Sequence, residues 1–212
     1  MIKDILKGKS LGRILMNKYC QKYLGAISGK TIDFGSGKNP SYIKYLKKDI
    51  KLTRTDYNNN KNPDLVIDLN KKIELGDGLF DNAIFLNTVY ILENPTSSLK
   101  EIYRILKPRG KLFMTFPLVF NEASEPVDYW RWTSQGIDKV LRQAGFEYIK
   151  KYKIGERFSC AISLANPFRK LKYLNIIFYP LALFLDKILP NKIKKLHPCP
   201  LGYFVICKKY NA

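Results

Sequence analysis

Short apolar runs alternate along the chain with segments whose apolar residues recur every three or four positions. The runs predict strands over seven stretches: 31–34, 52–56, 65–68, 83–86, 112–116, 146–154 and 202–208. Strands that alternate with helical segments are typical of an α/β fold with a mostly parallel sheet. Because 212 residues suit one hydrophobic core, we expect residues 1–212 to form a single domain.

Several expected helices have recognisable starts and ends. Residues 1–28 are expected to form an N-terminal helical cap. Asn39 followed by Pro40 suits the first turn of the next helix, since Asn caps well and Pro is tolerated there. Later in the chain Thr133 is a good N-cap for a helix that Gly145 ends.

A further helix is expected over 97–107. Its apolar positions follow the helical spacing and lie on one face: Leu99, Ile102, Tyr103 and Leu106. Pro108 and Gly110 follow and are expected to end it.

Residues 155–200 separate the last two predicted strands and are too many for a hairpin loop. We expect a helical insertion of apolar and basic character. Within 167–196 an apolar stripe recurs at alternating spacings of three and four: Leu171, Leu174, Phe178, Leu181, Leu185 and Ile188. Smaller and polar residues lie on the opposite side: Lys172, Asn175, Ala182 and Asp186.

The apolar run within 167–196 is too short to span a bilayer, which takes about 20 apolar residues, and Pro180, Asp186 and Lys187 interrupt it. Arg169 and several lysines flank it. This pattern favours a pair of interfacial helices, bent near Pro180, that contact an anionic membrane. A lid or dimer helix packed on the domain fits the pattern equally well.

The net charge of +19 is unevenly distributed. Residues 151–212 hold 12 of the 37 Lys and Arg residues but only two of the 18 acidic ones. Such a field attracts nucleic acid, anionic lipid headgroups or phosphorylated substrates, although a Lys-rich composition with solvated charges would look the same.

The four cysteines form no Cys-x-x-Cys pair, so no metal site is expected. The N-terminus lacks the apolar region of a signal peptide. We therefore expect a cytoplasmic protein, with peripheral contact at the inner face of the membrane.

The stretch TIDFGSGKNP, residues 31–40, places an acid on a strand and two glycines in the turn after it. A P-loop would need Ser or Thr at position 39, and a dinucleotide-binding turn would need glycine at position 40. The acid favours a ligand with an ammonium or sulfonium group over a pyrophosphate. Asp56 and Asp68 end the next two predicted strands, where carboxylates can bind ribose hydroxyls or an adenine amino group.

The succession DFGSGKNP, TDY, DLVIDL and FDNAIFLNTVYILENPTSSLKEIYRILKPRGKLFMTFP resembles the class I S-adenosylmethionine-dependent methyltransferases, in the type 11-like branch that modifies small molecules. The resemblance covers 30–154 and the last strand, 202–208. It implies a three-layer, Rossmann-like, seven-stranded sheet, mostly parallel with one antiparallel strand, with helices on both faces.

By position, the resemblance also implies a site for S-adenosylmethionine. The methionine end would lie at Asp33, Gly35, Ser36 and Gly37. Asp56 would hold the ribose, Tyr57 would lie beside the adenine, and Asp68 and Leu69 would meet its edge. Asn87 would lie under the cofactor. Many relatives carry Glu-His where this chain has Tyr90-Ile91, so any acid–base role of that histidine is lost. The usual Pro-Gly-Gly turn is Pro108-Arg109-Gly110 here.

Residues 117–133, PLVFNEASEPVDYWRWT, are too polar and aromatic for a core segment. In the family this loop forms one wall of the acceptor pocket, and EPxDYWRWT resembles a submotif of bacterial relatives. Flat walls are expected from Tyr129, Trp130 and Trp132, an anion partner from Arg131, and a general base from Glu122, Glu125 or Asp128. The catalytic candidates are Glu122, Asp128, Tyr129 and Arg131. Alternatively, the tryptophans pin the loop and Arg131 pairs with Asp128.

Together these patterns predict a methyltransferase that O-methylates a small molecule or a lipid-linked glycan of a bacterial surface-polysaccharide pathway. An RNA-binding or RNA-modifying enzyme and a non-catalytic cofactor-binding protein are the alternatives. Nucleic acid is less favoured, because the predicted pocket loop is acidic and aromatic and does not carry the excess basic charge.

Overall fold

Seven strands form one sheet in the order β3-β2-β1-β4-β5-β7-β6 in the computed structural model, which describes residues 1–37, 40–123, 127–165 and 173–210. The strands are β1 (Lys30–Phe34), β2 (Lys51–Asp56), β3 (Leu65–Val66), β4 (Phe80–Leu86), β5 (Leu106–Pro117), β6 (Tyr148–Ile154) and β7 (Gly202–Lys208). β7 alone is reversed, because it pairs antiparallel with both β5 and β6 while the other described pairs are parallel. This confirms the predicted fold class.

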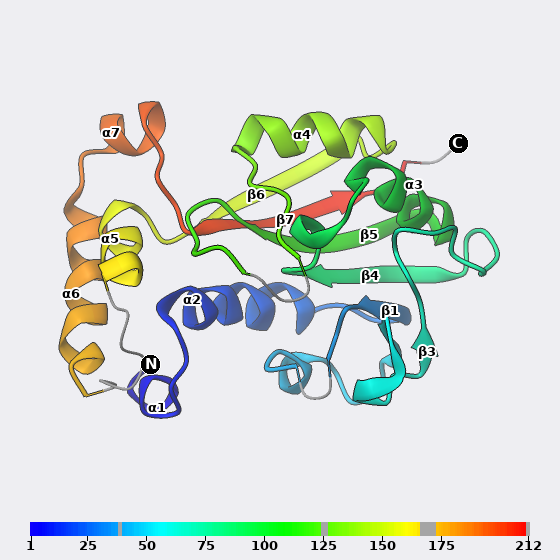
Figure 1. Ribbon diagram of the computed structural model, residues 1–212, viewed down its shortest axis with the longest axis horizontal. Coiled ribbons are helices and arrows are strands. Elements are labelled where there is room, and N and C mark those ends of the chain that lie inside the picture. Colours follow the sequence, from blue (N-terminus) through cyan, green and yellow to red (C-terminus); the bar gives the residue numbers. More distant parts are fainter. Residues whose placement is uncertain (38–39, 124–126, 166–172, 211–212) are drawn as a thin grey trace.

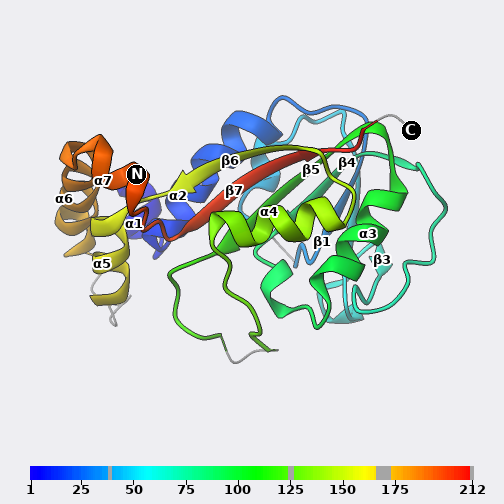
Figure 2. The ribbon, with the colours of Figure 1, turned by 90° about the horizontal axis from the view of Figure 1, so that it is seen from above.

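Helices cover both faces of the sheet (Figures 1 and 2). The α-helices are α1 (Ile2–Leu6), α2 (Leu11–Tyr19), α3 (Pro95–Ile105), α4 (Ser134–Gln143), α5 (Arg157–Ala165), α6 (Asn175–Ile188) and α7 (Asn191–Leu196). A π-helix, η1 (Cys20–Leu24), extends α2. Three 3-10 turns are η2 (Ile43–Tyr45), η3 (Asn59–Lys61) and η4 (Val89–Ile91).

The alternation of side chains along β4 shows how two core layers arise. Ala83 and Phe85 belong to the layer that α3 and α4 cover, whereas Ile84 and Leu86 belong to the layer that α2 and η1 cover. All four are buried. The second layer continues past the end of the sheet into α1, α5 and α6, which lie together at one end of the molecule (Figure 1).

The prediction of a helix that starts at Asn39 and Pro40 is wrong. Asn39 lies outside the described residues, and the described part of the β1–β2 connection contains only the 3-10 turn η2. The Tyr42 side chain is buried and hydrogen-bonded to Asp33 of β1. The chain therefore turns inward at Tyr42 and does not form the expected helix.

The helix expected over 97–107 is shifted at both ends. It starts at Pro95 because the Asn94 side chain accepts a hydrogen bond from the Ser97 amide at 3.1 Å. It ends at Ile105, and β5 begins at Leu106 and runs through Pro108 and Gly110. A cation from the far end of the chain stabilises this C-terminus: Lys209 Nζ donates to the carbonyl oxygens of Tyr103, Arg104 and Leu106.

The insertion consists of α5, α6 and α7, between β6 and β7 in the chain. α6 continues as one helix through Pro180, and a separate helix, α7, follows Pro190. Leu171 and Lys172 of the predicted stripe lie outside the described residues. Among the described helices none is long and apolar enough to cross a membrane.

Candidate functional site

The turn after β1 is shaped by two glycines. Gly35 and Gly37 have φ angles of +64° and +65°, a region that side chains rarely adopt. At Gly35 a Cβ would also lie 2.7 Å from Thr88 Oγ1, so the turn and the segment after β4 are in close contact. Ser36 between them is buried, and its amide donates to Thr55 O of β2 at 3.2 Å. The glycine turn therefore leaves backbone free of side chains at the carboxyl end of the parallel strands, where ligands bind in this kind of sheet.

Asp33, on β1, is fully buried just before this turn. The Tyr42 hydroxyl lies 2.9 and 2.8 Å from its two carboxylate oxygens and donates to them. Burial raises the pKa of Asp33 to about 7, and the Tyr42 hydrogen bond and the charge of Arg54 oppose that rise. The protonation of Asp33 is therefore sensitive to any cation placed beside it.

Asp56, at the end of β2, carries a buried oxygen without a hydrogen bond. Its Oδ1 accepts from the Tyr57 amide at 2.9 Å, whereas Oδ2 has no hydrogen-bond partner. Lys61 Nζ is 3.6 Å from Oδ2 as an ion pair, and the Lys61 side chain is half exposed. A buried carboxylate oxygen without a donor is costly, so this position fits a hydroxyl-bearing ligand such as a ribose.

The other residues expected at the adenine end differ in their surroundings. Tyr57 is 58% exposed and free to lie against a flat ring. Leu69 is buried in the core, so its side chain does not face an open site.

Asp68 is not at a strand end, because β3 stops at Val66. Its Oδ1 accepts from the Asn70 amide at 3.0 Å and its Oδ2 lies 3.6 Å from Lys71 Nζ. The carboxylate therefore organises a local turn, in addition to any contact with a ligand.

Asn87 follows β4 in a left-handed conformation with φ +53°. Its amide and its side-chain oxygen both bond to Thr115 Oγ1 at 2.9 Å, and its Nδ2 donates to Met16 Sδ at 3.5 Å. The side chain is thus held between β5 and α2, and α2 reaches the same sheet edge as the glycine turn.

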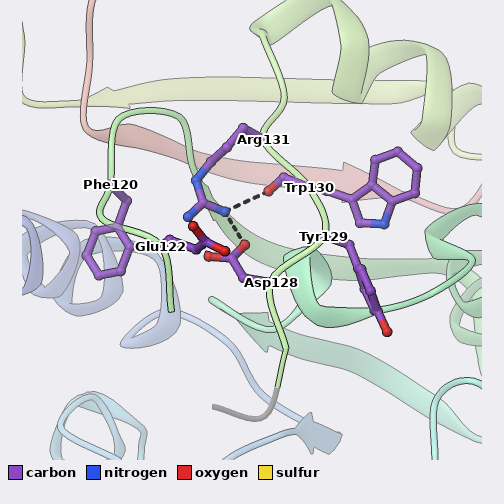
Figure 3. Close-up of a pocket in the computed structure, with 6 residues that line it drawn as sticks. All are labelled: Phe120, Glu122, Asp128, Tyr129, Trp130 and Arg131. Carbon is purple, nitrogen blue, oxygen red and sulfur yellow. Dashed lines mark hydrogen bonds and ion pairs between the residues drawn. The ribbon is translucent and has the colours of Figure 1, made fainter. Parts of the chain in front are cut away.

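An open pocket of about 280 Å³ lies in the loop after β5 (Figure 3). Its lining consists of Phe120, Glu122, Asp128, Tyr129, Trp130 and Arg131. The returning arm of the loop is attached to the segment after β4, because the amides of Tyr129 and Trp130 both donate to Tyr90 O. This segment also carries Thr88, which touches Gly35, so the loop and the glycine turn belong to one continuous edge.

Arg131 and Asp128 are paired with each other inside the pocket. Arg131 donates through both terminal nitrogens to the two carboxylate oxygens, one of them at 2.6 Å. The guanidinium beside it holds the pKa of Asp128 below its ordinary value. Figure 3 shows the guanidinium pointing toward Asp128 and Glu122. Asp128 is therefore a weak base here. Glu122 is exposed, so it is the better placed of the two carboxylates to act as a general base. Glu125 lies outside the described residues.

Only one of the two tryptophans faces the pocket. Trp130 is 40% exposed, and its ring nitrogen donates to Leu92 O at 2.7 Å. Trp132, expected as a pocket wall, is 8% exposed and belongs to the core. It stacks on Trp130 with ring centres 5.8 Å apart and meets Phe116 edge-on. Its apolar ring is more stable against Phe116 than in solvent, so Trp132 supports the wall that Trp130 forms.

Several residues of this edge are not apparent from the sequence alone. Tyr42 holds Asp33 from nearby in the chain, whereas Thr88, Thr115 and Met16 contact Gly35 and Asn87. Phe120 lines the pocket. Of these, only Tyr42 had a local signal, an apolar ring close after the glycine turn. Within the described residues no cluster of three His, Cys, Asp or Glu side chains could hold a metal ion.

A family model described as a methyltransferase domain matches residues 32–114. No sequence among the curated proteins matches the chain. A S-adenosylmethionine-dependent methyltransferase from Archaeoglobus fulgidus is similar in structure, with a TM-score of 0.62, 16% identity, and coverage of 93% of this chain and 94% of that one.

Two other solved structures share the fold. The phosphoethanolamine N-methyltransferase 2 of Haemonchus contortus, in complex with S-adenosylmethionine, gives a TM-score of 0.58 at 16% identity. That match covers 92% of this chain but 52% of the other, so this chain spans about half of that enzyme. The [4+2]-cyclase SpnF gives 0.60 at 17% identity, covering 93% of this chain and 80% of that one. At these identities the likeness establishes the fold alone.

Proposed function

We propose that this chain, which has the class I methyltransferase fold and a methyltransferase-domain match over 32–114, is an S-adenosylmethionine-dependent methyltransferase. The observation that carries the proposal is the buried Oδ2 of Asp56, which has no hydrogen-bond donor, at the same sheet edge as the two-glycine turn. A ribose hydroxyl supplies the missing donor, and the bare backbone at Gly35 and Gly37 lets a ligand approach closely.

In this proposal the chain binds its cofactor along the carboxyl ends of β1, β2 and β4. Asp33 attracts the cationic methionine end, Asp56 accepts from the ribose, and exposed Tyr57 lies against the adenine. Asn87 lies under the cofactor, where Thr115 and Met16 fix its orientation. When bound, S-adenosylmethionine supplies an electrophilic methyl group on a sulfonium centre.

We propose that the acceptor is a hydroxyl of a small molecule or glycan, held in the loop pocket. Tyr129 and Trp130 provide flat walls, and Glu122 is the acid–base candidate. Glu122 or water would take the hydroxyl proton as the acceptor oxygen received the methyl group, with S-adenosylhomocysteine as the leaving product. Asp128 positions Arg131, and the pair joins the two loop arms, because Asp128 accepts from the Ala123 amide and Arg131 donates to Asn121 O. The chain contributes chiefly alignment of the two reactants.

The acidic pocket also bears on the RNA alternative. Glu122 and Asp128 line it together with one paired arginine, so the pocket repels phosphate groups. A glycan of a surface-polysaccharide pathway fits both the pocket and the basic insertion better than RNA does. In this proposal the glycan is linked to a lipid in an anionic membrane that residues 167–196 contact. A non-catalytic protein would not need the exposed carboxylate of Glu122 in this pocket.

Calorimetry with S-adenosylmethionine and S-adenosylhomocysteine tests the cofactor claim. We expect the wild-type chain to bind both, and Asp56→Ala to weaken binding by about ten- to a hundredfold, since a charge-assisted hydrogen bond is lost. Asp64→Ala is the matched control, because Asp64 pairs with Arg54 at the exposed flank of the same strand. No binding by the wild type, or undiminished binding by Asp56→Ala in a folded protein, contradicts the proposal.

A further inference from the structure

Helix α6 packs on the protein through the face that carries its two buried polar residues, and Tyr179 and Ala182 of that face join the second core layer. Its buried residues are Asn175, Tyr179, Ala182 and Asp186. Ile176 and Leu183 also pack against this core, but five other large apolar side chains of the helix are exposed: Ile177 (65%), Phe178 (40%), Leu181 (47%), Phe184 (58%) and Ile188 (59%). A helix at the surface of a globular protein has the opposite arrangement. We call the exposed set the α6 apolar face.

This orientation is held by a buried carboxylate. Asp186 accepts from the amides of Glu156, Phe158 and Ser159 at distances between 2.7 and 3.4 Å, and from the Ser159 hydroxyl. These amides lie at the start of α5, where no carbonyl of the helix is available to accept from them. Asp186 therefore acts as the N-terminal cap of α5 from a neighbouring helix. Turning α6 to bury its apolar face would leave both the carboxylate and these amides without partners.

The charge around this face has one sign. Glu156 and Asp186 are the only two acidic residues from 151 to 212, and both are 7% exposed. Lys187, Lys192 and Lys195 are exposed at the C-terminal end of α6 and on α7. No exposed acid accompanies them in this part of the sequence, and Asp4 of the adjacent α1 pairs with Lys9, so the positive field of these lysines is not neutralised within the insertion.

The apolar surface continues onto neighbouring helices. α7 leaves Ile193 (38%) and Leu196 (62%) exposed. α1 packs beside α6 (Figures 1 and 2) and leaves Ile2 (55%) and Leu6 (41%) exposed. Large exposed apolar side chains gathered on neighbouring helices are typical of an interaction site.

The surface also lies at the functional end of the sheet. α5 follows the carboxyl end of β6, and the pocket loop follows the carboxyl end of β5. β6 and β5 point the same way, because both pair antiparallel with β7. The insertion and the pocket loop therefore leave the sheet at the same edge.

We propose that the α6 apolar face, with the lysines beside it, docks on the surface of an anionic phospholipid bilayer. Apolar side chains at the acyl boundary and lysines at the headgroup level are the two contributions that bind interfacial helices. A second copy of this chain fits less well, since a two-fold interface would bring the same lysines together.

Docking in this way delivers the pocket loop to acceptors that a membrane carries. That step rests on the proposed methyltransferase function. Docking itself does not, because it requires neither cofactor nor turnover.

Vesicle flotation tests the docking surface on the full chain. We expect recovery with vesicles of phosphatidylcholine containing about one third phosphatidylglycerol, and little recovery with phosphatidylcholine alone. The double variant Ile177→Gln and Phe184→Gln should lower the partition coefficient at least about tenfold, because two exposed side chains no longer insert. Val66→Gln is the matched control, an equally exposed apolar residue on the distant strand β3. Both positions of the double variant are exposed, so circular dichroism should show an unchanged fold.

A second variant tests the charge. Lys192→Gln with Lys195→Gln should weaken binding by about fivefold for each lysine, whereas Lys47→Gln with Lys48→Gln, exposed elsewhere, should not. Equal recovery with both vesicle types, or unchanged recovery of the Ile177→Gln and Phe184→Gln variant, overturns the proposal. A third result also overturns it: the wild type does not bind vesicles but forms a dimer in sedimentation velocity, and the double variant is a monomer. The α6 apolar face would then be a self-association surface.

Discussion

Asp33 is a single buried acid whose charge depends on pH near neutrality. Burial raises its pKa to about 7, against an ordinary value of 3.8. In the unliganded protein a large fraction of the residue is therefore protonated at pH 7. A cation bound beside it would favour the ionised form, so binding and deprotonation are linked.

We expect the affinity for S-adenosylmethionine to fall as the pH is lowered through about 7, by up to about tenfold for each pH unit. The reason is that protonated Asp33 no longer attracts the cationic methionine end. Dissociation constants measured between about pH 5.5 and about pH 7.5 check this, and Asp33→Asn should remove most of the dependence.

Unfolding does not account for such a loss, because the sign of the stability effect is opposite. The native state binds this proton more tightly than the unfolded chain does. The contribution of Asp33 to the free energy of unfolding therefore rises as the pH falls from about 7 toward 4. An affinity that is flat with pH in the wild type, or equally steep in Asp33→Asn, contradicts the assignment.

At the residue scale the sequence identifies the chemical type of each site residue better than it identifies the residues that contact it. EPxDYWRWT predicts an aromatic and charged pocket loop, and five of its residues line or support a pocket. That Trp132 turns into the core while Trp130 faces outward depends on Phe116, far away in the chain. The pairing of Arg131 with Asp128 was one of two alternatives at helical spacing, and only the folded loop distinguishes them.

At the element scale, the insertion depends on a cap that one helix provides for another. Asp186 of α6 satisfies amides at the start of α5, across about thirty residues of sequence. Sequence patterns place caps next to the helix they serve, so this one is found only when the two helices are seen packed together.

We expect Asp186→Ala to lower the free energy of unfolding by about 2–4 kcal/mol, because buried amides lose their acceptor. Urea unfolding followed by circular dichroism measures the change. Asp49→Ala, an exposed acid before β2, is the control and should stay within about 0.5 kcal/mol of the wild type. A loss as small for Asp186→Ala as for the control would mean that the cap does not hold α5 and α6 together.

At the scale of the whole molecule, two separate surfaces occupy one end of the sheet. The edge formed by Gly35, Asp56 and Asn87 is suited to a cofactor, and the α6 apolar face to a bilayer. The pocket loop leaves the sheet at the same edge as both, which is the arrangement that the proposed methylation of an acceptor at a membrane requires.

Hydrogen exchange should distinguish the two surfaces. S-adenosylhomocysteine is expected to slow exchange of amides around residues 33–37, 55–57 and 86–89, and to leave α6 unchanged. Anionic vesicles are expected to slow exchange in α6 and α7, because docking suppresses local opening, and to leave the glycine turn unchanged. Protection of the same segments by both additions would mean that the two surfaces are one.

The order of the strands, most of the helices, the glycine turn and the acids Asp33 and Asp56 could be predicted from the sequence alone, because each depends on periodicity or on residues close together in the chain. The stripe on 167–196 and its basic flanks were equally visible. Which face of α6 points outward could not be predicted, since an apolar stripe ordinarily packs inward. The tertiary structure decides it, because buried Asp186 satisfies the amides of α5 and this bond network holds the Asp186 side of α6 against the protein.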